Sequence, residues 1–205
     1  ACLIYATKEA YRKAWSDAYT SDPPIPLNLD IELASACNAK CSFCLYGDRD
    51  WDASMKEPDW DGKAKRRFMP TEMAKKLIDE AAKLGIPAIK FNFRGESTLH
   101  KDYGAIVWYA RRRWYSPLRD NNDGRPPSDI ELGEIGGPAF FEILTNTNGN
   151  LPENTMTDPG KWTRAVDGLM ACTKVMISLD SMDPNIYPKV RVGLDLESAC
   201  KTIDE

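Results

Sequence analysis

Strand-like and helix-like segments alternate along most of this chain, and that order restricts the fold more than any other feature of the sequence. Strands are expected over residues 27–34, 88–94, 139–145 and 173–180. Helices are expected over residues 70–84, 102–115, 161–171 and 195–205. Because the connections between successive strands are too long for hairpins, the strands are expected to run parallel, with helices crossing between them. The sequence therefore predicts an α/β fold built of parallel β/α units.

Residues 7–20 carry apolar side chains at helical spacing, which predicts an amphipathic helix before the first strand. A proline-rich stretch then ends this helix. We therefore expect an N-terminal helical extension over residues 1–26 and one core domain over residues 27–205. Residues 46–68 and 116–138 show neither the strand nor the helix pattern. Each segment either contacts the substrate or forms a surface loop, ordered or disordered, and both alternatives stay open.

Polar residues alternate with apolar ones on at least three of the expected strands. They are Asn28, Asp30 and Glu32 on the first, Lys90, Asn92 and Arg94 on the second, and Lys174, Ser178 and Asp180 on the fourth. A parallel strand covered on both faces is apolar throughout. The polar face is therefore expected to line a wet or ligand-filled interior, with a solvent-facing sheet as the alternative. Its mixture of acids, including Glu142 of the third strand, and cations indicates a polar substrate.

Charge and hydropathy narrow the choice of partners. The net charge of −4 disfavours a general binder of nucleic-acid backbones. The basic run at residues 111–114 is interpreted as a solvated helix face, with a local basic patch as the alternative. No apolar run approaches the roughly 20 residues that span a bilayer, and the N-terminus has no signal-peptide pattern. We therefore expect a cytoplasmic protein without a membrane partner.

Three of the six cysteines are closely spaced just past the first expected strand, namely Cys37, Cys41 and Cys44. This end of the strands is the edge of the sheet where α/β folds place their catalytic and binding residues. The scattered positions of the others argue against a disulfide framework. Structural zinc normally takes a fourth ligand near by, and the only histidine, His100, lies far along the chain. A [4Fe–4S] cluster held by three thiolates leaves one iron without a protein ligand, free to take a bidentate ligand from solution. Zinc stays the alternative.

The spacing CxxxCxxC, with Phe43 just before the third cysteine, resembles the signature of the radical SAM superfamily. Three further stretches resemble the SAM-binding motifs of that superfamily, and each follows a later expected strand. They are "RGESTLH" at 94–100, "TNTNG" at 145–149 and "SLDS" at 178–181. The resemblance implies that Cys37, Cys41 and Cys44 hold a [4Fe–4S] cluster and that S-adenosyl-L-methionine (SAM) binds beside it, with Phe43 in the cofactor site.

The second motif supplies two of the implied cofactor-binding residues. Gly95 and Glu96 match the motif that holds the amino group of SAM through a close backbone and a carboxylate. The sequence departs from the family pattern at Arg94, which replaces the first glycine, and at Ser97, which replaces the proline. A turn glycine followed by the acid of a helix N-terminus is the alternative.

The third and fourth motifs supply the others. Thr147 is expected to face the SAM pocket, beside a tight turn at Asn148 and Gly149. By resemblance, Ser178 contacts the ribose or carboxylate of SAM, and Asp180 lies near the ribose. Arg191 pairs with the carboxylate of SAM, with a surface salt bridge as the alternative.

The resemblance implies an enzyme that cleaves SAM reductively at the cluster to generate a 5′-deoxyadenosyl radical, which abstracts hydrogen from a substrate. Such an enzyme needs a one-electron donor of the flavodoxin or ferredoxin type. A peptide or protein substrate is favoured because "SLDS" followed by "RVG" looks most like the peptide-modifying and molybdopterin-precursor branch. The alternatives are a small polar metabolite, an RNA substrate, and a non-catalytic protein that holds zinc or a structural cluster.

Barrels of this superfamily usually contain about six β/α units, whereas four can be counted here. The resemblance therefore predicts a partial (β/α) barrel of parallel strands with outer helices, truncated at its C-terminus. A piece of a longer polypeptide is expected, with a reduced version of the barrel as the alternative.

Overall fold

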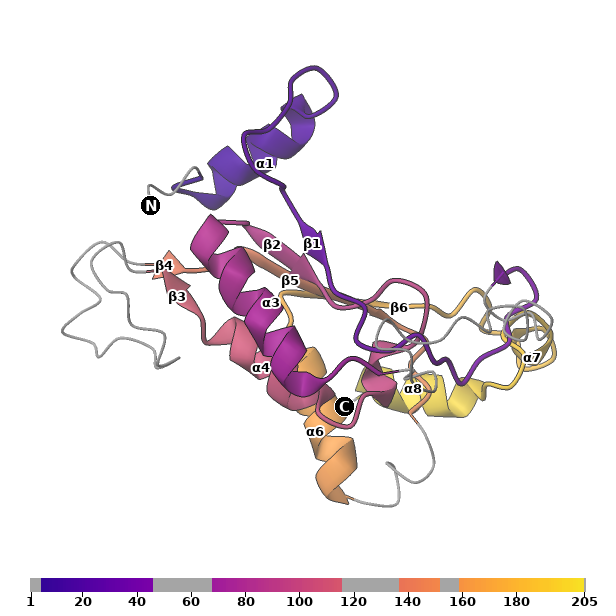
Figure 1. Cartoon of the computed structure of the whole chain (residues 1–205). Helices are drawn as coiled ribbons and strands as arrows, with labels where there is room; N and C mark the ends of the chain where they lie inside the picture. The colour runs from indigo at the N-terminus through magenta and orange to yellow at the C-terminus, as the bar shows by residue number, and fades with distance from the viewer. Residues whose placement is uncertain (1–4, 46–67, 116–136, 152–158, 205) are drawn as a thin grey trace, which may run out of the picture.

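The computed structural model describes residues 5–45, 68–115, 137–151 and 159–204. Its main element is a parallel sheet of four strands in the order β1-β2-β5-β6 (Figure 1). These strands are β1 (Leu29–Asp30), β2 (Ala88–Lys90), β5 (Glu142–Thr147) and β6 (Lys174–Ile177). The expected parallel α/β architecture is therefore confirmed, although each strand is shorter than, or shifted from, the range expected from sequence.

Helices cross between the strands where the sequence predicts them. They are α3 (Thr71–Leu84), α4 (Tyr103–Arg111) and α6 (Pro159–Ala171), and α8 (Leu196–Asp204) follows β6. The ends of α3 follow from local chemistry, because Pro70 precedes its first turn and Gly85 ends it in the left-handed conformation with φ +76°. Two short helices were not expected, η2 (Ser97–Leu99) and α7 (Tyr187–Val190).

The basic run at residues 111–114 does not form one solvated helix face. Helix α4 ends at Arg111, and β3 (Trp114–Tyr115) pairs antiparallel with β4 (Gly137–Pro138). Arg113 is buried, ion-paired with Asp79 and stacked 3.9 Å from the centre of the Tyr109 ring. The two long segments that fit no pattern lie, except for their last residues, outside the described part of the chain.

The apolar core lies on one face of the sheet. Ile89 and Phe91 of the second strand segment and Ile143 of β5 pack there against Ile78 of α3 and Ile106 of α4. Helices α3, α4 and α6 cover this face (Figure 1). The polar face is turned the other way, as the alternation of residue types predicts.

Helix α1 (Lys8–Asp17) lies on the polar side of the sheet (Figure 1). Tyr11 is buried in a small cluster with Tyr5 and Leu27, and its ring stacks 6.1 Å from that of Phe141. Its hydroxyl donates a hydrogen bond of 3.1 Å to Glu142 of β5. The N-terminal helix therefore shares packing with the sheet.

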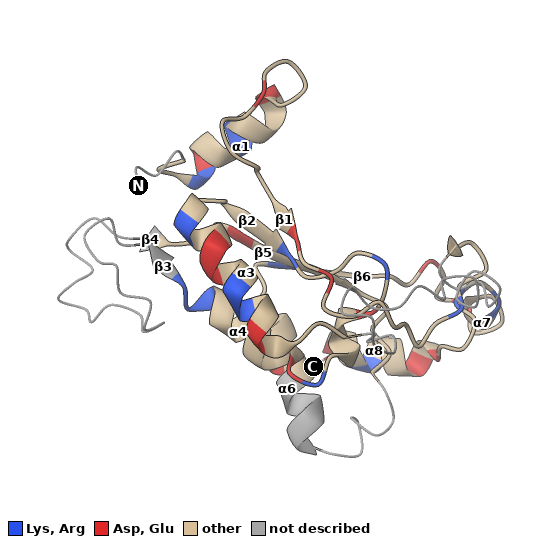
Figure 2. Ribbon diagram, viewed as in Figure 1, with Lys and Arg blue, Asp and Glu red and all other residues tan. Residues whose placement is uncertain are grey.

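Acidic and basic residues are interspersed along α1 and α3 (Figure 2). These two helices therefore lack the continuous positive face that a nucleic-acid backbone requires. None of the helices in the described part of the chain combines the length and apolar character of a membrane span.

We predict that Gly168→Ala destabilises the fold. A methyl group at this position of α6 would lie 2.7 Å from a ring carbon of Tyr103 and 2.8 Å from the Cα of Gly104. Overpacking of this kind costs about 1–3 kcal/mol, which exceeds the roughly 1 kcal/mol that alanine gains over glycine in a helix. Urea unfolding should show a lower free energy of unfolding, while the exposed neighbour variant Asp167→Ala stays near wild type. Equal stability of the two variants would contradict the close packing of α4 and α6.

Candidate active site

The three closely spaced cysteines, Cys37, Cys41 and Cys44, lie in the loop that follows β1. Cys37 is exposed, Cys44 is half-buried and Cys41 is buried. The Cys44 N–H donates to the Cys41 carbonyl oxygen at 3.0 Å, which closes a turn between them. The Ala39 N–H points at the Cys37 sulfur at 3.4 Å. The loop is thus folded back on itself around its cysteines.

The geometry of this loop argues against a single metal ion. Among the residues that the structure describes, no three His, Cys, Asp or Glu side chains converge closely enough to share one ion. Both ring nitrogens of His100 are occupied, one by the Met69 carbonyl oxygen at 2.7 Å and the other by the Asp102 N–H at 3.0 Å. Zinc with its sulfur ligands at about 2.3 Å therefore has no preformed site here.

The same three thiols suit a cubane cluster better. Each thiolate of such a cluster binds a different iron, so the sulfurs need to surround a larger object than one ion. Although Cys37 is exposed as a residue, desolvation of its sulfur raises its pKa, the Ala39 N–H opposes this rise, and the charges of Glu96, Cys41 and Cys44 add to it, so these three groups lie within electrostatic reach of Cys37. The donor set, three thiols on one short loop, fits a [4Fe–4S] cluster with one open iron.

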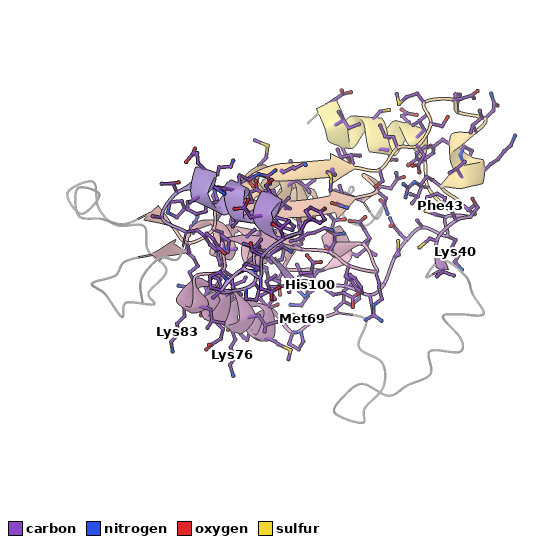
Figure 3. All side chains as sticks on the ribbon, turned by 90° about the horizontal axis from the view of Figure 1, so that it is seen from above. Lys40, Phe43, Met69, Lys76, Lys83 and His100 are labelled. Atoms are coloured by element: carbon purple, nitrogen blue, oxygen red, sulfur yellow. The ribbon has the colours of Figure 1, made fainter. Side chains whose placement is uncertain are left out.

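A segment that follows β6 supports the cysteine loop. The Lys40 N–H donates to the Val192 carbonyl oxygen at 2.8 Å, and the Ser42 N–H donates to that of Val190 at 3.1 Å. Cys41 packs in an apolar cluster with Tyr187 of α7. Phe43 and Lys40 lie beside α7, beyond the ends of the strands (Figure 3). Residues about 150 positions apart in sequence therefore form one unit.

Arg191 connects the cysteine loop with the segment that follows β6. Its Nη1 donates to the Cys41 sulfur at 3.4 Å, its Nε donates to Asp180, and its guanidinium lies 5.1 Å from the centre of the Phe43 ring. Burial acts to lower the pKa of Arg191, but the hydrogen bonds to Asp180 and Cys41 outweigh it and raise that pKa. The partners of Arg191 in this structure are therefore residues of the same site.

Glu96 is the most buried acid of the site, with 3% of its surface exposed. Its Oε1 accepts from the Thr98 N–H at 3.2 Å, the Thr98 hydroxyl at 2.7 Å and the Thr147 hydroxyl at 2.9 Å. Its Oε2 accepts from the Asn148 N–H at 2.8 Å. The structure thus gives this carboxylate internal donors, including an N–H of the first turn of η2, whereas the family resemblance implies the ammonium of SAM as its partner. Burial raises the pKa of Glu96, and the hydrogen bonds oppose that rise.

Gly95 lies where the loops after β1 and β2 come closest. A Cβ at this position would lie 2.2 Å from the Ala34 carbonyl oxygen and 2.5 Å from that of Ala36. The next residue, Glu96, donates its N–H to the Ala36 carbonyl oxygen at 2.9 Å. Glycine is therefore required here by the approach of the cysteine-bearing chain.

The third motif forms the turn that its sequence predicts, with Gly149 at φ +74°. Thr147 is buried and points at Glu96. Sequence reasoning missed Asn38, whose amide donates to the Asn150 carbonyl oxygen at 2.6 Å and whose oxygen accepts from Asn148 at 2.7 Å. The run of asparagines around the turn was the available signal, but their common partner is distant in sequence.

The fourth motif contributes a hydroxyl and a strained acid. The Ser178 N–H bonds to the Thr147 carbonyl oxygen at 2.9 Å, while its half-buried hydroxyl makes no hydrogen bond to the described residues. Asp180 is the only non-glycine residue of the described chain with positive φ, at 60°. It uses this conformation to meet Arg191.

A cavity of about 630 Å³ opens on the polar face of the sheet, between the strands and α1. Its polar lining includes Asp30, Lys90, Glu142 and Lys174. These are four of the seven charged residues that the strand alternation places on the polar face. Of the other three, Glu32 and Arg94 pair with each other at 2.6 Å, and Asp180 pairs with Arg191.

The chain matches the family model of the radical SAM superfamily over residues 31–205. A search of curated proteins found no match. Among solved structures, the fold is similar to SuiB of Streptococcus suis bound to S-adenosylmethionine, with a TM-score of 0.55 and 15% sequence identity. A second structure of SuiB, bound to the precursor peptide SuiA, gives a TM-score of 0.53 at 15% identity. The two comparisons cover 95% of this chain and 34% and 33% of SuiB, so the chain spans about a third of the length of that protein.

We predict that Glu96→Gln lowers the free energy of unfolding by about 1–3 kcal/mol, because an amide offers one acceptor atom where the carboxylate offers two to its buried donors. Urea unfolding of the metal-free chain measures this change. The matched control is Glu72→Gln on the exposed side of α3, whose only described partner is Lys75. A Glu96→Gln variant as stable as this control would show that the carboxylate does not hold the loops together.

Proposed function

The chain belongs to the radical SAM superfamily, and we propose that it binds a [4Fe–4S] cluster through Cys37, Cys41 and Cys44, with SAM beside it. The observation that carries this proposal is the folded loop with three thiols, in which the Cys41 sulfur faces the cation of Arg191. When bound, the cluster supplies the electron that cleaves SAM to methionine and a 5′-deoxyadenosyl radical. The protein is then an enzyme that removes a hydrogen atom from a substrate.

The residues around the loop have distinct tasks in this proposal. Thr147 and Glu96 fix the position of the strand ends through their buried hydrogen bond. Ser178 offers a half-buried hydroxyl to the polar part of SAM, and the exposed ring of Phe43 supplies an apolar surface beside the cluster. A one-electron donor of the flavodoxin or ferredoxin type delivers the reducing electron, and the cytoplasmic location predicted from sequence suits such a donor.

We assign the cavity on the polar face of the sheet to the substrate. Met176 lines this cavity, and Ser178 lies two residues further along the chain, just past the end of β6, which is about 7 Å of extended chain. The cavity therefore reaches close to the strand ends where SAM is proposed to bind. Such a neighbourhood is needed because a radical must meet its target before it is quenched.

The charges of the cavity favour a substrate that carries carboxylates. Among the described residues, the ammonium groups of Lys90 and Lys174 have no hydrogen bond or ion pair, whereas Glu142 is occupied by Tyr11 and Arg12. A peptide with acidic side chains matches two unpaired cations. The similar fold of SuiB, which has been solved with a precursor peptide, supports this substrate class. A small polar metabolite with carboxylates is the competing outcome of the test below.

We predict that anaerobic reconstitution loads about four iron and four sulfide ions per chain. Dithionite and SAM should then yield 5′-deoxyadenosine, detected by chromatography. Cys37→Ala, Cys41→Ala and Cys44→Ala should each abolish this product. The control Cys200→Ala, outside the loop, should leave both the metal content and the product unchanged. One equivalent of zinc without cleavage of SAM would refute the proposal and favour a structural metal site.

We predict that Lys90→Gln and Lys174→Gln each lower turnover of acidic peptides by about tenfold, the loss expected when a charge-assisted hydrogen bond worth about 1.5 kcal/mol is removed. Cleavage of SAM without substrate should stay unchanged. The matched control is Lys83→Gln on the outer side of α3 (Figure 3). Mass spectrometry of a peptide panel, with amidated counterparts and small dicarboxylates alongside, measures the effect. If the control and cavity variants turn over acidic peptides equally well, the cavity is not the substrate site.

A further inference from the structure

Arg191 is held in place from three directions. Its Nε donates to the Asp180 carboxylate, its Nη1 donates to the Cys41 sulfur at 3.4 Å, and the face of the Phe43 ring lies 5.1 Å from its central carbon. Only 13% of its side-chain surface is exposed. A guanidinium with this many partners keeps a fixed orientation, since its donors form a planar fork.

The backbone around Arg191 also fixes its position. Val190 and Val192, its two neighbours, accept the hydrogen bonds from the cysteine loop at Ser42 and Lys40. This pairing places the intervening Arg191 beside Cys41. Asp180 reaches Arg191 from a left-handed conformation at φ 60°, which costs energy for a residue other than glycine. A costly conformation at the residue that orients the guanidinium indicates that this orientation matters.

The contact with sulfur is unusual for an arginine that serves only to bind a ligand carboxylate. One of its nitrogens is directed at the chain's own thiol, and another is already paired with the Asp180 carboxylate. A protein sets the reduction potential of an iron–sulfur cluster through three factors: hydrogen bonds to the sulfurs, net charge and solvent exposure. Arg191 brings a hydrogen bond and a positive charge to the Cys41 sulfur, which are two of these factors.

We propose that Arg191 raises the reduction potential of the cluster through its hydrogen bond and charge at the Cys41 thiolate, and this inference rests on the proposed function. Reduction adds one negative charge to the cluster and its thiolates. A fixed cation at low exposure stabilises the more negative state more than the oxidised one. Asp180 is a positioning residue that orients the guanidinium.

The test is a redox titration of the reconstituted protein, followed by electron paramagnetic resonance, without SAM. Arg191→Gln should disfavour reduction at least tenfold in the equilibrium constant, which for one electron is a shift of about 59 mV to lower potential. Arg191→Lys keeps the positive charge but loses the planar set of guanidinium donors, so the reduction potential of this variant should lie between those of wild type and Arg191→Gln. If Arg191→Gln loses its cluster, Arg191→Lys still tests the proposal. Lys189→Gln, which removes the same charge from an exposed neighbour, is the matched control and should not shift the potential.

Binding of SAM, measured in parallel, separates this role from the one that the family resemblance assigns. An unchanged potential in Arg191→Gln, with weaker binding of SAM and full metal content, would show that Arg191 serves the carboxylate of SAM and would overturn the inference alone. A wild-type chain that takes up no iron and sulfide would overturn the proposed function, and the inference with it. A lowered potential at full metal content supports it.

Discussion

The buried carboxylate of Glu96 is the interaction on which the arrangement of the site depends. A charged group at 3% exposure is costly unless hydrogen bonds compensate it, and Glu96 receives them from Thr98, Thr147 and Asn148. Its backbone N–H binds the chain just before Cys37. Three strand-end segments are thereby joined through one residue, and the cysteine loop starts from a fixed point.

The two faces of the sheet have different roles: one packs the core and the other borders the cavity. The apolar face, packed under α3 and α4, supplies most of the buried core. The polar face carries the cavity and is bordered by α1, which reaches Glu142 through Tyr11 and Arg12. Tyr11 packs in one cluster with Leu27 and Ala88, so residues on both sides of the expected boundary between 26 and 27 share packing. The boundary itself stays a prediction.

The features that sequence predicts best depend on near neighbours in the chain. The left-handed Gly85 that ends α3, the Asn148-Gly149 turn and the order of strands and helices all follow from local residue types. The features that it missed depend on distant partners. Helix α4 ends early because β3 pairs with β4, and Asn38 joins residues of a turn more than 100 positions away. The hydrogen bonds that Glu96 accepts within the protein were missed for the same reason, because no spacing in the sequence places Thr147 beside it.

The electrostatic surroundings of the three thiols are unequal, and this inequality has a consequence for the proposed cluster. The residue Cys37 is exposed overall, but desolvation of its sulfur raises its pKa, and the negative charge of Glu96 raises it further. Cys41 is buried beside the cation of Arg191. Negative charge is therefore better accommodated at the Cys41 side of the loop than at the Cys37 side. If the proposed cluster forms at this loop, an added electron is stabilised most on the side of Arg191 and α7. The segment after β6 then takes part in the redox chemistry of the cluster together with the cysteine loop.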